Sequence, residues 1–307
     1  MSGASNGGSE AAGRWSLRLL GAFELRGPAG GERVALPGKR ERLLLAYLAL
    51  SPKGRQPRSK LAALLWGDSA DETALDNLRT CLWALRKAFG DAKHRVLASD
   101  GDDVVLDLAP FDVDVLALRR VAASGDGVDL EAVAGLYSGE LLAGLDVDSE
   151  EFESWRRAEA ARCREQAVEV LARLMAERGA AKQPERAIEV GHAILALDPL
   201  HEDTVRQLMR LYAAGGRRTA AIQAYRSLAE TLRAELGVEP EAATREMLAE
   251  VSRGDPPRSA DVAARGVRAE PSPPEARSLP AAPAPRARVN FTVAIVAGVL
   301  LLAVGAV

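Results

Sequence analysis

The chain has few of the residues that build metal sites and disulfide frameworks, since its 307 residues contain two cysteines and three histidines. Cys81 and Cys163 lie far apart, each within an apolar helical pattern, so we expect two buried free thiols in a reducing compartment. His94, His192 and His201 lack the spacing of zinc ligands. The sequence therefore predicts neither a metal site nor a cofactor.

A strong net charge is also lacking, because 40 basic and 43 acidic side chains leave a formal charge of −3. This balance excludes a protein that coats polyanions along its whole length. The charge is nevertheless uneven: residues 33–95 hold 13 basic and 6 acidic groups, whereas residues 108–251 hold 17 and 26. We expect a compact basic block beside an acidic domain, with nucleic acid as a partner of the first only.

Signatures of catalysis are missing as well. Six residues separate Gly31 from Gly38, and Lys39 is followed by Arg40, so the phosphate-loop pattern fails. No nucleophile elbow or pair of catalytic carboxylates stands out. We therefore expect that the protein is not an enzyme.

The first part of the chain shows an ordered series of elements. Residues 1–14 are rich in Gly, Ser and Ala without an apolar core, which predicts a disordered start and not a secretory signal. Alternation from Trp15 to Leu25 predicts a strand with one buried face, followed by a turn and a second strand at 33–36. Three helices over 39–50, 59–66 and 69–89 precede a hairpin over 95–106 with an Asp-Gly turn. This order predicts a winged helix-turn-helix domain over residues 15–107.

Serines mark the expected starts of the later two helices. Ser59 is predicted to be the N-cap of the second helix. Ser69 and Glu72 have the capping-box spacing that would begin the third helix.

The third helix is predicted to face DNA. Its apolar stripe contains Leu75, Leu78, Leu82, Leu85 and Phe89. The predicted DNA-binding residues lie on or beside the opposite face: Arg79, Thr80, Trp83, Arg86 and Lys87. For an isolated helix, the ordinary interpretation of such a cationic face would be that it is solvated. The place of this helix in a helix-turn-helix instead favours insertion of that face into a major groove. Two alternatives stay open for Trp83, contact with a thymine methyl or sugar edge and packing on the wing, with packing slightly favoured.

From residue 108 onward the pattern becomes helical. Helices are predicted over 112–123, 129–137, 150–178, 184–197, 201–214, 218–236 and 241–251. A 34-residue spacing relates Leu171 to Val205, Leu174 to Leu208, Ala187 to Ala221 and Ile188 to Ile222. This period predicts an all-α domain like tetratricopeptide repeats over 108–251, with a concave surface for a peptide, a ligand or another subunit.

The C-terminal part has a different composition. Residues 252–288 hold eight of the sixteen prolines and predict a disordered or semi-extended linker. Phe291 to Val307 is a run of 17 residues in which only Thr292 is polar, preceded by Arg286 and Arg288. We therefore expect a transmembrane helix within 289–307 that anchors cytoplasmic domains to the inner membrane. An apolar tail, or a chain cut within a longer span, is the alternative.

Sequence motifs add a family resemblance. The segments are Leu19–Leu25 (LLGAFEL), Leu36–Ala49 (LPGKRERLLLAYLA), Leu61–Asp68 (LAALLWGD) and Asn77–Gly90 (NLRTCLWALRKAFG), with Tyr137–Gly144 (YSGELLAG) and Phe152–Trp155 (FESW) downstream. Together they resemble the SARP class of bacterial activators with its bacterial transcriptional activator domain, over about residues 15–251. The resemblance implies binding to duplex DNA, often at direct repeats, and recruitment of RNA polymerase through the loop between the second and third helices, here residues 67–73.

Two positions depart from that family pattern. Ala84 stands where the family commonly has Arg, and the wing tip Asp100-Gly101-Asp102-Asp103 is acidic. Carboxylates near a phosphate backbone repel it.

Taken together, these features predict a DNA-binding transcriptional regulator, which the resemblance implies is an activator and which the C-terminal segment would hold at the membrane. The alternative is a protein-interaction adaptor whose winged helix no longer binds DNA; a homodimer is left open in either case.

Overall fold

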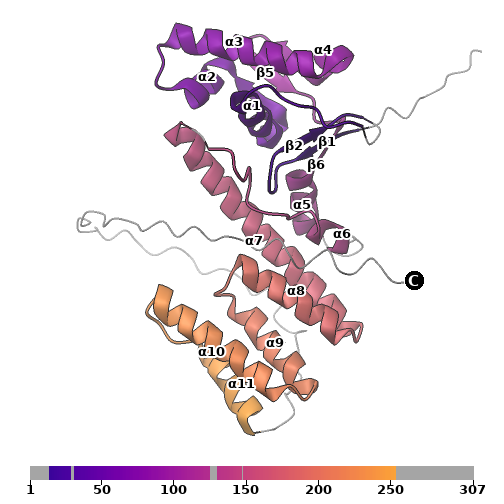
Figure 1. Ribbon diagram of the computed structural model, residues 1–307, viewed down its shortest axis with the longest axis vertical. Coiled ribbons are helices and arrows are strands. Elements are labelled where there is room, and N and C mark those ends of the chain that lie inside the picture. Colours follow the sequence, from indigo (N-terminus) through magenta and orange to yellow (C-terminus); the bar gives the residue numbers. More distant parts are fainter. Residues whose placement is uncertain (1–13, 29–30, 125–129, 147, 254–307) are drawn as a thin grey trace, which may run out of the picture. The chain divides into compact units, whose positions relative to one another are not determined.

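The structure is a computed structural model that describes residues 14–28, 31–124, 130–146 and 148–253 (Figure 1). The predicted disordered start, linker and membrane segment lie outside the described residues, apart from Arg14, Ser252 and Arg253.

The N-terminal strands form a three-stranded sheet with a late partner. The sheet has the order β2-β1-β6, from β1 (Trp15–Arg18), β2 (Glu24–Arg26) and β6 (Phe111–Val113). β1 runs antiparallel to β2, with Leu17 opposite Leu25, and parallel to β6. The prediction of one strand from Trp15 to Leu25 is wrong, because the chain turns at Gly21 in the left-handed region, with φ of 98°. The predicted strand at 33–36 is reduced to a bridge between Arg26 and Arg33.

Three helices and a second sheet follow. The helices are α1 (Lys39–Leu50), α2 (Arg58–Trp66) and α3 (Asp71–Ala88). The second sheet has the order β3-β5-β4, from β3 (Arg55–Pro57), β4 (Leu97–Asp100) and β5 (Asp103–Leu106). Short turns η1 (Pro52–Gly54), η2 (Gly90–Ala92) and α4 (Lys93–Val96) connect them. The three predicted helices and the hairpin after the third are thus present.

The predicted serine caps are wrong. The N-cap positions of α2 and α3 are Pro57 and Ala70, and neither side chain caps the helix. β3 runs directly into α2, and the first amide of the helix, Arg58 N, donates to the carbonyl of Asp102 at 2.9 Å. The amide of Ser69 donates to the Trp66 carbonyl at 2.9 Å, so Ser69 belongs to the turn that ends α2.

The rest of the described chain is mainly helical, as predicted, although Asp112 and Val113, the predicted start of the first of these helices, belong to β6. Its helices are α5 (Asp114–Ala123), α6 (Leu130–Ala134), α7 (Glu150–Ala180), α8 (Pro184–Leu197), α9 (Glu202–Ala214), α10 (Arg218–Glu235) and α11 (Ala242–Arg253). The residues paired by the 34-residue spacing are buried, except that Ile222 is partly exposed. A Cβ added at Gly191 would lie 2.7 Å from Leu208 Cδ2, which shows how closely α8 approaches α9.

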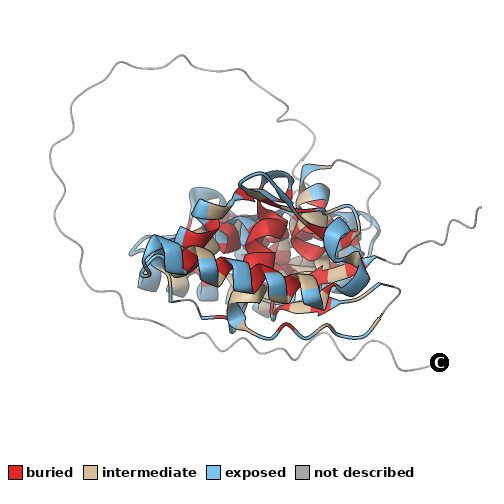
Figure 2. Cartoon of the chain, turned by 90° about the horizontal axis from the view of Figure 1, so that it is seen from above, coloured by how far each residue is buried: buried red, intermediate tan, exposed pale blue. Residues whose placement is uncertain are grey.

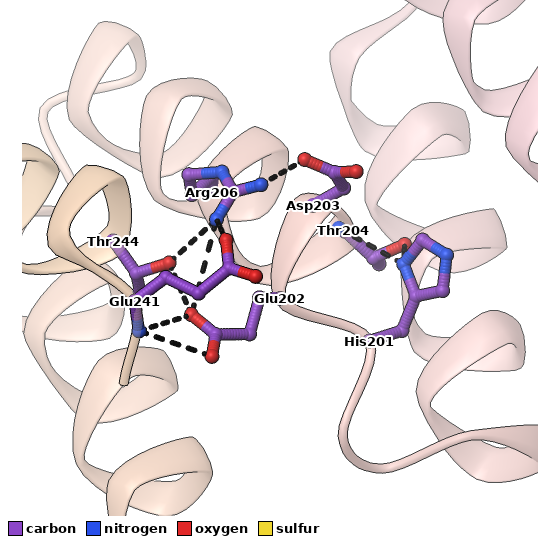
Figure 3. Close-up of polar contacts among 7 residues, drawn as sticks. All are labelled: His201, Glu202, Asp203, Thr204, Arg206, Glu241 and Thr244. Carbon is purple, nitrogen blue, oxygen red and sulfur yellow. Dashed lines mark hydrogen bonds and ion pairs between the residues drawn. The ribbon is translucent and has the colours of Figure 1, made fainter. Parts of the chain in front are cut away.

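A polar network joins the last helices (Figure 3). The Glu202 carboxylate accepts hydrogen bonds from the Glu241 amide at 3.0 Å and from the buried Thr244 hydroxyl at 2.5 Å, just where α11 begins. Arg206 donates to Thr244 and Glu241, at 2.7 and 3.1 Å, and pairs with Asp203. Every one of these groups has a partner, so the network fixes α11 on α9.

One apolar core spans the winged helix and the first helices after it. It runs from Trp15 to Leu174, and a second cluster covers Leu171 to Val251. Figure 2 shows the buried residues gathered in the interior, with exposed residues on the outside. The Tyr47 ring of α1 lies 4.7 Å from that of Trp155 of α7, centroid to centroid.

A buried carboxylate and two buried thiols lie in the first core. Asp114 accepts the amides of Leu19 and Leu20 at 2.8 and 2.9 Å. Burial raises the pKa of its carboxyl, although these amides act in the opposite direction. The prediction of buried free thiols is confirmed, and burial raises the pKa of Cys81 to about 12 and that of Cys163 to about 11.

The fold class needs one correction, because it included a transmembrane helix. None of the helices in the described ranges is long and apolar enough to cross a membrane. The 17-residue run ending at Val307 lies outside those ranges. A helix of that length would reach about 26 Å, short of the roughly 30 Å hydrocarbon core, so the prediction rested on a run that is marginal in length. The described fold is a winged helix followed by a helical domain.

Candidate nucleic-acid interface

α3 is held by its apolar side and presents its other side to solvent. Leu78, Leu82 and Leu85 are buried in the first core, and Leu75 is partly buried. Phe89, just after the helix, packs edge-to-face on Trp15 with 5.1 Å between ring centroids. The core stripe predicted from the sequence is therefore confirmed, with Leu75 at its margin.

The exposed face of α3 carries four of the five predicted contact residues: Arg79, Thr80, Trp83 and Lys87. Arg79 forms an ion pair with Asp76 one turn earlier, and both side chains are 69% exposed. The Thr80 hydroxyl donates to the Asp76 carbonyl at 3.1 Å. The cation of Arg79 is thus partly compensated by an acid on the same face.

Trp83 and Lys87 form a contact of their own on this face. Trp83 is 62% exposed and is not buried against the wing, in contrast to the slightly favoured alternative. Lys87 Nζ lies 5.3 Å from the centroid of the Trp83 ring, a cation–π geometry. The helix therefore displays an indole and an ammonium group side by side.

Arg86 lies differently from the other four. Its Nε donates to the Leu97 carbonyl at 3.2 Å and its Nη2 to Ser99 Oγ at 2.9 Å, both on β4. Arg58 reaches the same Ser99 hydroxyl at 2.7 Å. Burial, and then the charge of Arg58, lower the pKa of Arg86. Arg86 thus ties α3 to the wing, a role that the helical wheel did not reveal.

The wing tip is less acidic in effect than its sequence suggests. Arg55 on β3 pairs with Asp100 at 2.8 Å and with Asp103 at 2.5 Å, and these bonds raise the pKa of Arg55. Two of the three carboxylates therefore have a counter-ion, which comes from a strand paired alongside the hairpin. The signal was present in the sequence as a basic residue before Pro57, but the strand register was needed to interpret it.

A cleft lies where α2, α3 and the wing tip meet. Arg58, Ser59, Leu75, Leu78, Arg79 and Asp102 line it. Two arginines and one carboxylate line it, and one of the arginines, Arg79, is also paired with Asp76. The predicted loop at 67–73 is mostly exposed; residues 67–70 connect α2 to α3, whereas residues 71–73 form the first turn of α3. In the preceding α2, the Leu64 carbonyl accepts a hydrogen bond at 2.7 Å from the hydroxyl of Ser149, the N-cap of α7.

Comparison with known proteins gives consistent relatives. A family model described as the bacterial transcriptional activator domain matches residues 106–252. The chain is 28% identical over 253 residues to the regulatory protein DnrI of Streptomyces peucetius, covering 74% of this chain and 88% of that protein. It is 30% identical over 248 residues to the transcriptional regulatory protein MoaR1 of Mycobacterium tuberculosis, covering 75% and 76%.

A solved structure has the same fold. Mycobacterium tuberculosis EmbR, in complex with a low-affinity phosphopeptide, aligns with a TM-score of 0.61 at 21% identity, over 80% of this chain and 66% of that chain. The relatives are named as regulatory proteins, and the helices of the described ranges include none that could span a membrane. The predicted localisation at the inner membrane is therefore wrong, and nothing in these comparisons supports the membrane as a partner.

Proposed function

Because the chain belongs to the SARP family of bacterial transcriptional regulators, we propose that it regulates transcription by binding duplex DNA through the exposed face of α3. The observation that carries the proposal is the set of residues on that face, where Arg79, Thr80, Trp83 and Lys87 lie together without burial. An α-helix fits the width of a major groove, and the positive charge on the exposed side of α3 complements the negative charge of DNA.

The proposal gives the five residues different tasks. Arg79 and Lys87 contact phosphates or base edges, whereas Thr80 and Trp83 lie between them and contact bases. Arg86 positions the wing through Leu97 and Ser99 and acts on DNA through that geometry. Arg58 adds positive charge beside the same face, and phosphate contacts from such a group supply salt-dependent affinity, whereas Arg55 compensates Asp100 and Asp103 of the wing.

Residues beyond α3 take the remaining roles. The division into a DNA-binding part at 15–107 and a helical part at 108–251 belongs to this proposal. The exposed loop at 67–73 contacts RNA polymerase, as the family resemblance implies, so that the protein acts as an activator. The acidic helical part takes a protein or peptide partner, or a second copy of the chain, because its charge disfavours nucleic acid.

The test compares two charge reversals in the full chain. Duplexes recovered from a random library are titrated with the wild type, with Lys87→Glu and with Arg226→Glu, an exposed residue of α10. Both variants change the net charge equally, so a general electrostatic effect would weaken them alike. We expect at least a tenfold loss for Lys87→Glu and little change for Arg226→Glu. Equal losses, or no recovered duplex, would contradict the proposal and favour a protein-interaction adaptor.

A further inference from the structure

Trp83 is the residue of α3 that phosphate binding does not explain. Phosphate contacts need cations and hydrogen-bond donors, whereas an indole offers one N–H and a large apolar surface. Exposing that surface to water has a hydrophobic cost, and yet Trp83 is 62% exposed. The described residues contain two other large exposed hydrophobics, Leu236 and Val238, both in the turn after α10. An apolar group in the middle of the cationic face therefore indicates a contact that is itself apolar.

We infer that Trp83 binds the 5-methyl group of a thymine in the major groove and so fixes part of the sequence preference; this rests on the proposed function. The edges of the base pairs in that groove carry hydrogen-bond donors and acceptors and one apolar group, the thymine methyl. An indole placed over a polar base edge would desolvate it without supplying a full set of partners. Over a thymine, the same contact buries two apolar surfaces.

The neighbours of Trp83 support a nucleic-acid occupant over a protein surface. Thr80 and Lys87 lie three residues before and four residues after it, so the three side chains share one face of the helix. Lys87 Nζ lies 5.3 Å from the centroid of the indole, which places a cation at the apolar contact. Residues 33–95 together hold 13 basic and 6 acidic groups. This charge complements a polyanion, and duplex DNA is the polyanion that also offers methyl groups in a groove.

The cation–π contact also restrains the ring. A lysine over one face of the indole limits the rotation of the Trp83 side chain. The Thr80 hydroxyl bonds back to the Asp76 carbonyl at 3.1 Å, so that its methyl group is the remaining apolar atom of that side chain. Thr80 and Trp83 thus form a small apolar pair on a polar face. We expect sites with a thymine next to a base pair contacted by Lys87.

The experiment removes one methyl group from the DNA. Duplexes recovered by the full chain are resynthesised with each thymine replaced in turn by deoxyuridine, which keeps base pairing and loses the 5-methyl group. Affinities are measured for the wild type, for Trp83→Ala and for Leu236→Ala, which removes a similarly exposed apolar side chain outside α3. The Trp83 variant keeps every cation, so its binding is measurable at low salt and its salt dependence should match that of the wild type.

We expect the wild type and Leu236→Ala to bind about fourfold more weakly when one particular thymine becomes uracil, the equivalent of about 0.8 kcal/mol for one buried methyl group. Trp83→Ala should bind the thymine and uracil duplexes equally. Where a cytosine at that position weakens binding, 5-methylcytosine should restore part of the affinity for the wild type and for Leu236→Ala, but not for Trp83→Ala. The inference is overturned if no thymine shows the effect, or if Trp83→Ala keeps it undiminished. Absence of DNA binding by the wild type would instead overturn the proposed function.

Discussion

At the scale of single residues, the two neighbouring cations in the last turn of α3, Arg86 and Lys87, have different surroundings. Lys87 is exposed and contacts the Trp83 ring, whereas the neighbouring Arg86 is partly buried and bonded to β4. Both are basic residues in the last turn of α3. Only the position of the wing separates a residue that can reach DNA from one that positions the interface.

Replacing each residue by alanine should separate these roles. Arg86→Ala leaves the Leu97 carbonyl without its charged donor and Ser99 with Arg58 alone, so we expect thermal or urea unfolding to show a loss of about 1–2 kcal/mol in the free energy of unfolding. Lys87→Ala should leave the free energy of unfolding within about 0.5 kcal/mol and make the plot of log affinity against log salt shallower by about one unit. A shallower slope without any loss of stability in Arg86→Ala would assign that residue to phosphate contact.

Asp76 should oppose DNA binding. Its carboxylate is exposed on the face of α3 and pairs with Arg79, so Asp76→Asn removes a negative charge and releases a cation. We expect affinity for a recovered duplex to rise about two- to fivefold at 0.15 M salt and less at higher salt. Asp68→Asn, on the exposed loop before α3, is the matched control. A fall in affinity would mean that the ion pair orients Arg79 for contact.

At the scale of elements, the wing depends on a strand that precedes α2. β3 pairs with β5 and places Arg55 between Asp100 and Asp103. The sequence predicted the hairpin and its acidic tip, but it could not reveal the counter-ion. Arg55 lies 45 and 48 positions before Asp100 and Asp103, and the strand register brings it to them.

Removing Arg55 should expose the acidity of the wing. Arg55→Ala leaves the tip with three uncompensated carboxylates, so we expect DNA affinity to fall about threefold or more at low salt. Adding Asp100→Asn and Asp103→Asn to this variant should restore most of the loss. Gel shifts of the single and triple variants make the comparison. Failure of the added changes to restore binding would indicate that Arg55 itself contacts the backbone.

The sequence predicted the helices of this fold better than its strands. The helices other than the short α4 were predicted from apolar periodicity, because burial repeats along a helix face; α4 has only four residues and lies partly where the sequence predicted the hairpin. The sequence did not predict the break at Gly21 or the pairing of β1 with β6, because strands of three or four residues contain too few alternations to define their ends. For the site, the outward residues of α3 follow from the wheel, whereas the contacts of Arg86 and Arg55 depend on tertiary neighbours.

At the scale of the whole molecule, the first core crosses from the winged helix into the helices that follow. β6 pairs with β1, Asp114 accepts the amides of Leu19 and Leu20, and Phe152 is fully buried beside Tyr47. In each of these contacts, one partner lies in residues 15–107 and the other lies after residue 107. Their loss would leave the N-terminal sheet without a strand and with two unsatisfied amides.

A fragment of residues 14–107 should therefore fold poorly. We expect residues 14–253 to show a cooperative thermal transition by circular dichroism, and the fragment to show a broad one or none. Within the longer chain, Asp114→Ala should cost about 2–4 kcal/mol because it leaves buried amides without an acceptor. A fragment as stable as the longer chain would show that the shared core contributes little.

The central claim is that α3 enters the groove of duplex DNA, and site-directed cleavage tests it most directly. Because Cys81 and Cys163 are buried, with their pKa values raised to about 12 and about 11, a cysteine introduced on the surface can be labelled selectively with an iron chelate that cleaves DNA. The label is placed at Asp76→Cys on the face of α3 or at Arg226→Cys on α10, and gel shifts first establish that both proteins still bind a recovered duplex. We predict strand cleavage within the bound site from residue 76 and none above background from residue 226. Equal cleavage from both positions, or none from residue 76 in a protein that binds, would contradict the assignment of α3 as the DNA-reading helix.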